Sequence, residues 1–208
     1  MGTATKILIG LVALAVIFGL YVVSSYNGLV GLQQATDAQW AQVQNVYQRR
    51  ADLVPNLVST VSGAANFEKS TLLAVTEARA SVGRAQLPSG TAPTDPAQLA
   101  AFQQAEGQLG SALSRLLVVS ERYPDLKATA GFRDLQAQLE GTENRIAVER
   151  GRFNDVVQAY DTAIRRFPAV LLAGALGFSS RPYFTATAGS DTPPKVQFDF
   201  GGAAPAKP

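Results

Sequence analysis

Three glutamates on one long amphipathic stretch, Glu140, Glu143 and Glu149, come closest in type and spacing to metal chemistry. Helical carboxylate sites that hold two iron ions combine such glutamates with histidines in Glu-x-x-His pairs from facing helices. The chain contains no histidine and no cysteine. Glu140 and Glu143 lie on one helical face, whereas Glu149 follows another. We therefore predict no metal site and no cofactor.

Nucleophilic catalysis has no better support in the sequence. Serine is common, but there is no G-x-S-x-G sequence and no histidine that could activate a serine. The absence of cysteine excludes thiolate chemistry and disulfides. The glycines of residues 174–177 (GALG) follow no predicted strand and come with no lysine, so they do not indicate a phosphate-binding loop. We predict that the protein is not an enzyme.

The charges indicate no nucleic-acid partner. Eighteen basic and 16 acidic residues are mixed along the chain and give a net charge of +2. A basic stripe with interleaved aromatic residues, which a single-strand binder would use, is missing.

The densest polar patch instead suggests structural or interaction chemistry. It contains Glu143, Asn144, Arg145, Glu149 and Arg150. Arg145 and Glu149 lie four residues apart, so they can form an exposed helical ion pair that contributes about 0.3–0.5 kcal/mol.

This patch belongs to a seam that repeats at alternating steps of three and four residues over five heptads. The seam predicts one helix of about 40 residues, on the order of 60 Å long, which starts at Asp125 and is stopped by Pro168. Thr142 and Glu149 occupy seam positions where apolar residues belong, and polar seam residues usually select register or partner. The seam comprises Phe132, Leu135, Leu139, Thr142, Ile146, Glu149, Phe153, Val156, Tyr160, Ala163 and Phe167.

A second seam supplies a possible partner for Glu149. A buried glutamate needs a compensating charge, because an unpaired buried charge costs several kcal/mol. Arg49 and Arg50 lie one turn before Pro55, and we interpret both first as a solvated flank with buried stems. Arg50 also lies on the second seam, so an Arg50–Glu149 bridge between the two helices is the alternative hypothesis. The seam comprises Trp40, Val43, Tyr47, Arg50, Val54, Leu57 and Val61.

Pro55 lies inside the second seam. It lacks an amide hydrogen and crowds the preceding turn, so it predicts a kink rather than a straight helix. Gly63 and Asn66 are weak interruptions further on. Periodicity does not decide between one kinked helix and two over residues 38–86, and we favour one.

Residues 88–96 (PSGTAPTDP) predict a clear break in the helical pattern. Their turn-forming composition indicates a flexible surface connection. Thr94 or Asp95 can cap the next helix, with Pro96 suited to its first turn. That helix carries a third seam and ends near Tyr123, because the following proline disfavours helical geometry there. The third seam comprises Leu99, Phe102, Glu106, Leu109, Leu113, Leu116 and Ser120.

The N-terminal elements that precede these seams are apolar. Residues 7–23 carry no charge and no strongly polar group, which is the short end of a membrane span, and residues 24–26 can extend it. A cleaved signal peptide is the alternative. The run is long, its basic end is the single Lys6, and no A-x-A-like site follows it. We predict a retained transmembrane anchor over residues 1–25, with the lipid bilayer as its partner.

The orientation of this anchor follows from the same few charges. Lys6 precedes the span, and no lysine or arginine lies within 20 residues after it. The positive-inside rule then favours an internal N-terminus and an external bundle.

The C-terminal part differs from the long seams. Residues 170–178 (VLLAGALGF) are apolar but too few to span a bilayer. They predict a short helix or loop packed on the bundle, with a re-entrant or interfacial segment as the alternative. Val196, Phe198 and Phe200 alternate with polar residues, which is a weak extended-segment signal, and residues 201–208 predict a disordered tail.

Together these elements predict an all-α fold. An N-terminal transmembrane helix is followed by an elongated antiparallel bundle of long helices over residues 26–168 and by a short irregular C-terminal segment over residues 169–200.

Several stretches resemble the LemA family of bacterial membrane proteins, with a dense match from about residue 20 to 200. The resemblance implies a short N-terminal anchor, an elongated helical bundle and a place in the bacterial inner membrane, with the bundle on the periplasmic side by the charge argument above. The family has no established activity or catalytic residues to carry over. The stretches are YNGLV at 26–30, Trp40, RRADLVPNLVSTV at 49–61, EAR at 77–79, ERYPDLKA at 121–128, LEGTENRIAVERGRFNDVVQAYDTAIRRFP at 139–168 and GFSSRPYF at 177–184.

The sequence therefore favours a non-enzymatic, membrane-anchored helical scaffold or adaptor that self-associates. The alternative is a regulatory partner of a membrane enzyme, such as a protease or transporter, that acts through residues 168–184. The residues proposed for structural or interaction roles are Arg50, Pro55, Thr142, Asn144, Arg145 and Glu149.

Overall fold

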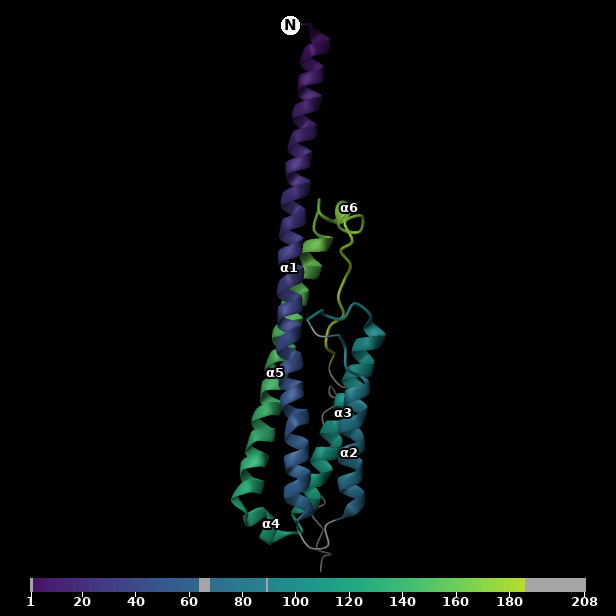
Figure 1. The fold of residues 1–208 in the computed structure, drawn as a ribbon. Helices are drawn as coiled ribbons and strands as arrows, with labels where there is room; N and C mark the ends of the chain where they lie inside the picture. The colour runs from purple at the N-terminus through teal and green to yellow at the C-terminus, as the bar shows by residue number, and fades with distance from the viewer. Residues whose placement is uncertain (1, 64–67, 89, 186–208) are drawn as a thin grey trace, which may run out of the picture.

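The apolar N-terminal run and the seam of Arg50 form one uninterrupted helix, α1, in the computed structural model (Figure 1). α1 spans Thr3–Ser62 and has 60 residues, which makes it about 90 Å long. The side chains of residues 7–23 are exposed, and Leu29 is the first buried residue of the helix. α1 is apolar and long enough to cross a membrane. The structure describes residues 2–63, 68–88 and 90–185.

The prediction of a single helix over residues 38–86 is wrong. α1 ends at Ser62 with Gly63 as its C-cap, and a second helix, α2, spans Lys69–Arg84. α2 runs back along the bundle beside α3 (Figure 1). The turn places Val75 and Val82 in the same apolar cluster as Leu57, whereas a continued helix would have carried its apolar face beyond the bundle. Four long helices rather than three long segments therefore build the core.

The helix α3 spans Pro96–Ser120 and begins as the sequence predicts. The Asp95 carboxylate accepts a hydrogen bond from the amide nitrogen of Ala97 at 2.8 Å, with Pro96 in the first turn. An N-cap of this kind satisfies an amide that has no partner within the helix. The connection before it is not a free surface loop, because Ala92 is 1% exposed.

The longest seam is shorter as a helix than its periodicity predicts. Residues after Tyr123 first form the short helix α4, Pro124–Ala128, and the chain is extended at Thr129. The long helix α5 then spans Ala130–Arg165, with 36 residues, or about 54 Å. The Thr129 hydroxyl caps it by accepting from the amide of Phe132. The prediction of a start at Asp125 is therefore wrong by one short helix.

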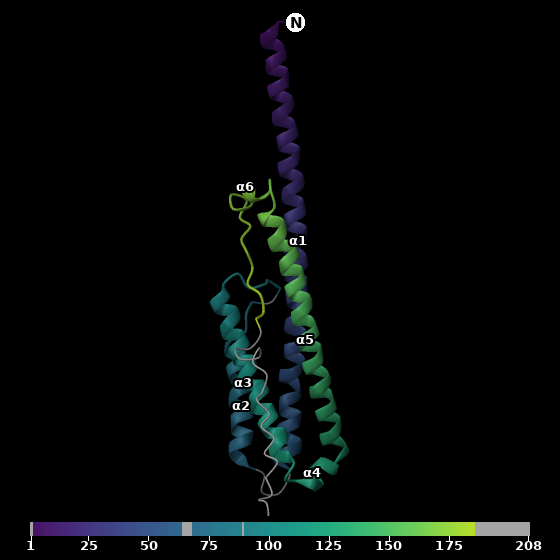
Figure 2. The ribbon, with the colours of Figure 1, turned by 180° about the vertical axis from the view of Figure 1, so that it is seen from behind.

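The long helices form an elongated antiparallel bundle from whose end the first half of α1 projects (Figure 1). α1 packs mainly on α5, and α2 packs mainly on α3. Both views show the loop before α3 at the same end of the bundle as the projecting half of α1, and α4 at the opposite end (Figure 2). The predicted all-α fold is confirmed: the described residues contain helices and no strand.

The predicted packing of residues 170–178 on the bundle is also confirmed. A short helix, α6, spans Val170–Ala173. Ala173 and Phe178 are buried in one cluster with Leu29 of α1 and Ile164 of α5. From here residues 174–185, which we call the strap, run back along the bundle (Figure 2). The extended segment predicted at residues 196–200 and the predicted tail at 201–208 lie outside the described residues.

Candidate functional site

The guanidinium of Arg50 joins three helices inside the bundle. Its Nη2 donates to the carboxylate of Glu106 on α3 and to the Glu106 backbone oxygen at 3.0 Å. Its Nη1 donates to Oε1 of Glu143 on α5 at 2.6 Å. The side chains of Arg50 and Glu106 are 4% and 3% exposed, whereas that of Glu143 is 49% exposed. The buried charge of this cluster is therefore the Arg50–Glu106 pair.

The prediction of an Arg50–Glu149 bridge is wrong. Glu149 accepts instead from Nε2 of Gln39 at 2.7 Å and from Nη1 of Arg152 at 2.8 Å. Glu143 lies six residues before Glu149, or about 9 Å along the axis of α5, and it is Glu143 that lies at the height of Arg50. Glu149 is also only partly buried, with 16% of its side chain exposed.

The surroundings of Arg50 keep its guanidinium positively charged. Burial alone would lower the pKa of the Arg50 guanidinium, but its hydrogen bonds and the charges of Glu143 and Glu106 raise it above the ordinary value. Tyr47, one turn away, lies with its ring 5.2 Å from the Arg50 guanidinium carbon. Burial raises the pKa of the Tyr47 hydroxyl to about 12. Tyr47 is therefore neutral beside a permanent cation.

This arrangement is suited to setting helix register rather than to catalysis. It pairs charges from α1, α3 and α5 at one height, and a shift of any helix by one turn, about 5.4 Å, would separate them. A buried ion pair of this kind contributes less to stability than to excluding other arrangements. The Nε atom of Arg50 is buried with no partner among the described residues, so the cluster does not satisfy every donor of its guanidinium.

The other predicted site residues lie apart from this cluster. Thr142 is 2% exposed, and its hydroxyl donates to the backbone oxygen of Gln138 in its own helix at 2.7 Å. Asn144 and Arg145 are exposed and line a shallow surface hollow with Glu149. Glu149 pairs with Arg152, three residues on, rather than with Arg145.

Pro55 is exposed and lies inside α1 without ending it. The helix continues for another seven residues to Ser62. The kink expected at Pro55 stays a prediction.

The three glutamates considered for metal binding go to different partners. Glu140 accepts from Gln136, Glu143 from Arg50 and Glu149 from Gln39. Across residues 2–63, 68–88 and 90–185, no group of three potential ligands is close enough to hold a metal ion.

A second polar network fastens the strap to the bundle. Asp161 of α5 accepts from the amide of Arg181 at 3.1 Å and from the Ser180 hydroxyl at 3.0 Å. The Arg181 guanidinium donates to the backbone oxygen of Ala92. The amide of Ala92 in turn donates to Asp37 of α1 at 2.8 Å. Asp161, Arg181 and Asp37 are all buried, so this chain of bonds ties the strap, the loop before α3 and both central helices together.

The end of the strap is held by Asn154 and by an aromatic cluster. The Asn154 amide donates to the backbone oxygen of Phe184 and accepts from its nitrogen, both at 2.9 Å. The Phe184 ring stacks on Trp40 with a centroid distance of 6.0 Å. Trp40 also meets Phe102 and Phe153 edge to face at 5.5 and 5.4 Å. Trp40 therefore joins α1, α3, α5 and the strap in one core.

Sequence reasoning missed most of these partners. Glu106 lies on the third seam between Phe102 and Leu109, and a charged residue at such an inward position could have indicated a buried ion pair. Asp37, Asp161 and Arg181 carried no such signal. Their importance comes from the strap, which returns to α5 from about 20 residues further along the chain.

The sequence matches the model of a known protein family. The model of the LemA family matches residues 39–198, a range that includes the Arg50 cluster and the strap. The chain belongs to the LemA family. This confirms the resemblance seen in the sequence, and the matched range begins after the apolar half of α1.

Curated LemA-like relatives cover most of the chain as well. Magnetosome protein MamQ 1 and magnetosome protein MamQ 2 of Paramagnetospirillum magneticum are each 28% identical to it over 183 residues. Magnetosome protein MamQ of Magnetospirillum gryphiswaldense shows the same identity. Each alignment covers 81% of this chain and 67% of the relative. With the apolar helix α1, these similarities identify a membrane-associated LemA-family protein.

Proposed function

We propose that the protein is a non-enzymatic helical scaffold, anchored in the bacterial cell membrane, that self-associates through its bundle. The observation that carries this proposal is the continuity of α1 from the apolar segment into the core. A single helix joins the anchor to Trp40 and Arg50 without a linker, so the bundle cannot swing freely relative to its anchor. A continuous helix that holds the surface of the bundle at a fixed distance from the membrane suits a scaffold better than an enzyme.

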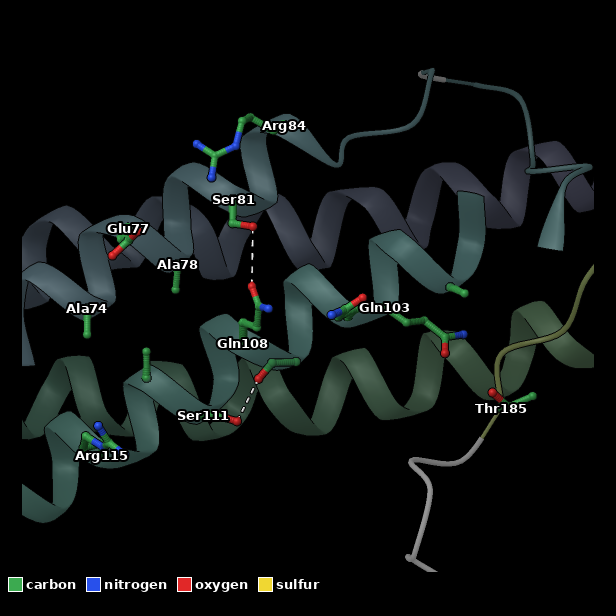
Figure 3. Close-up of a pocket in the computed structure, with 14 residues that line it drawn as sticks. Ala74, Glu77, Ala78, Ser81, Arg84, Gln103, Gln108, Ser111, Arg115 and Thr185 are labelled. Carbon is green, nitrogen blue, oxygen red and sulfur yellow. Dashed lines mark hydrogen bonds between the residues drawn. The ribbon is translucent and has the colours of Figure 1, made fainter. Parts of the chain in front are cut away.

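The outer face of α2 and α3 is the surface that best suits self-association. An open groove of about 1140 Å³ lies between these helices (Figure 3). Small residues such as Ala74, Ala78 and Ser111 line its floor, which lets another helix approach closely. Glu77 and Arg115 lie on opposite helices at its margin. A two-fold related copy could place the glutamate of one groove against the arginine of the other.

Replacing Gly107 with arginine is expected to convert the self-associated protein to a monomer. Gly107 lines the groove, is exposed and has open space around the position of a Cβ atom. The new side chain would therefore fill the groove without disturbing the fold. Size-exclusion chromatography with light scattering on the detergent-solubilised protein measures the change in mass.

Gly141→Arg is the matched control for this substitution. Gly141 is also an exposed helical glycine with open space around it, but it lies on α5 away from the groove. The control should keep the mass of the unmodified protein. Self-association through this face would be contradicted if the unmodified protein were monomeric across micromolar concentrations. It would also be contradicted if the two variants had the same mass.

We further propose that the bundle lies outside the cytoplasm. Lys6 before the apolar segment and the lack of basic residues after it until Arg49 favour this orientation. Alkaline phosphatase fused after Pro208 is expected to be active, because this reporter works only in the periplasm. An active fluorescent reporter that folds only in the cytoplasm, fused at the same site, would reverse the assignment.

A regulatory role through residues 168–184 is the second candidate, and one observation favours it. Leu171 is 70% exposed, although Ala173, Phe178, Arg181 and Phe184 face inward and serve the bundle itself. A stoichiometric partner that co-purifies with the full chain and is lost on Leu171→Glu, with no homo-oligomer, would support this role over the scaffold.

A further inference from the structure

Exposed apolar side chains gather where α5 turns into α6. Phe167 is 75% exposed, Val170 48% and Leu171 70%. We call residues 165–171 the tip. The tip is not loosely attached, because Ala173 and Phe178 just beyond it are buried against Leu29 of α1. The exposure of its apolar side chains is thus a feature of an ordered element that presents them outward.

The tip lies at the end of the bundle from which the apolar half of α1 projects (Figures 1 and 2). Tyr26 of α1 meets the Phe178 ring with a centroid distance of 5.6 Å, which fixes the height of this region on the helix. Tyr26 lies three residues beyond Val23, the last residue of the apolar run, or about 4.5 Å along the axis. The headgroup layer of a bilayer is roughly 5–8 Å thick on each side of the hydrocarbon core. An anchored bundle therefore holds its tip within the headgroup layer.

The tip also carries two exposed arginines. Arg165 is 70% exposed and shares its guanidinium between Asp161 at 3.4 Å and the Ser180 hydroxyl at 2.8 Å. Arg166 is exposed and forms no ion pair with any other residue that the structure describes. A cation beside exposed apolar side chains matches the boundary between phosphate groups and acyl chains.

We propose that the tip is a membrane-contact site that binds anionic phospholipid headgroups in the same bilayer that α1 crosses. Phe167, Val170 and Leu171 enter the boundary with the acyl chains, and Arg166 pairs with a lipid phosphate. The exposed apolar surface of the anchor faces the same lipid, so one environment covers both surfaces. This second attachment fixes the rotation and tilt of the bundle on the membrane, and it does not depend on self-association.

The absence of cysteine from the chain allows a direct test with single spin labels. Leu171→Cys and Val118→Cys are labelled in the full chain, with one chain per nanodisc of phosphatidylcholine and phosphatidylglycerol. Val118 is the matched control, because it is also 70% exposed but lies near the far end of α3. The label at 171 is expected to collide with oxygen rather than with a water-soluble nickel complex, at a depth of about 5–10 Å. The label at 118 should favour the nickel complex.

Arg166→Gln tests the contribution of the phosphate contact. In the same nanodiscs it should lower the ratio of membrane-bound to free tip, measured from the two components of the spin-label spectrum, about fivefold. Arg166→Lys should retain the ratio of the unmodified protein, and pure phosphatidylcholine should lower it as the glutamine variant does. A label at 171 as open to the nickel complex as the label at 118 would overturn the proposal. Protection of residue 171 only when two chains share a disc would also overturn it, in favour of a contact between copies.

Discussion

Arg50→Met is expected to destabilise the bundle by about 3–5 kcal/mol, because it leaves a buried charge without its partner. The Glu106 side chain is 3% exposed and has Arg50 as its ion-pair partner. Methionine has a similar length but no charge, so the carboxylate must either stay desolvated or take up a proton. Glu143 is not a substitute for the lost cation, since it is itself an acid that Arg50 binds.

Denaturant unfolding of the detergent-solubilised full chain measures this effect. Trp40 is the only tryptophan and is fully buried, so its fluorescence reports directly on the core. Arg122→Met is the matched control: it removes an arginine from an ion pair with Glu68, but both side chains are largely exposed. That variant should lose less than about 1 kcal/mol.

The double variant Arg50→Met, Glu106→Met separates pairing from packing. Replacing both members of a buried pair with apolar residues is often neutral or stabilising, so this variant should recover most of the loss. It should also tolerate shifted helix register, which would appear as broadened amide resonances. A loss for Arg50→Met no larger than for Arg122→Met would show that the buried pair has no role of this kind.

Trp40→Ala is expected to cost about 3–5 kcal/mol, the range found when a fully buried aromatic residue is truncated. Trp40 is 0% exposed and touches the rings of Phe102, Phe153 and Phe184. The substitution therefore opens a cavity where three helices and the strap meet. Circular dichroism at 222 nm measures the unfolding, since the variant has no tryptophan whose fluorescence could report on the core.

Local release of the strap would distinguish a specific effect of the Trp40→Ala substitution from a general loss of stability. Phe184 loses its stacking partner in Trp40→Ala, so residues 178–185 should become cleavable by protease well below the unfolding midpoint. Trp40→Phe should keep the strap protected and lose less stability, because the indole Nε1 has no hydrogen-bond partner among the described residues. Equal protease resistance of the alanine variant and the unmodified protein would contradict a role for Trp40 in holding the strap.

Local chemistry explains which features the sequence predicted correctly. Asp95 caps α3 because a short carboxylate before Pro96 can reach a free amide whatever the rest of the fold does. Pro168 follows the end of α5 because it cannot supply an amide to the helix. The apolar run of residues 7–23 lies outside the bundle. It is apolar on every face, so it lacks the amphipathic pattern of a helix that buries one face in a bundle.

Apart from the start of α5, the main errors concern contacts between distant segments. The end of α1 at Ser62 lies beside Gly63, which the sequence offered only as a weak interruption. The return of α2 depends on α3, whose apolar face packs against it. A seam shows which side of a helix faces inward, but it does not show which helix lies opposite or at what height. The favoured interpretation of Arg50 as part of a solvated flank is wrong, because Arg50 is 3% exposed, and the alternative pairing with Glu149 is wrong as well.

The sequence by itself determined the apolar N-terminal run, the helical fold and the lack of histidine and cysteine, because each depends on residue type or spacing along one helix. Only the tertiary structure decided that Arg50 is buried and pairs with Glu106 and Glu143, and that the strap is fastened through Asp161. It also decided that the tip returns to the end of the bundle from which the apolar half of α1 projects (Figure 1). These outcomes depend on the antiparallel heights at which the helices pack. That arrangement is set by the fit of all the side chains at once.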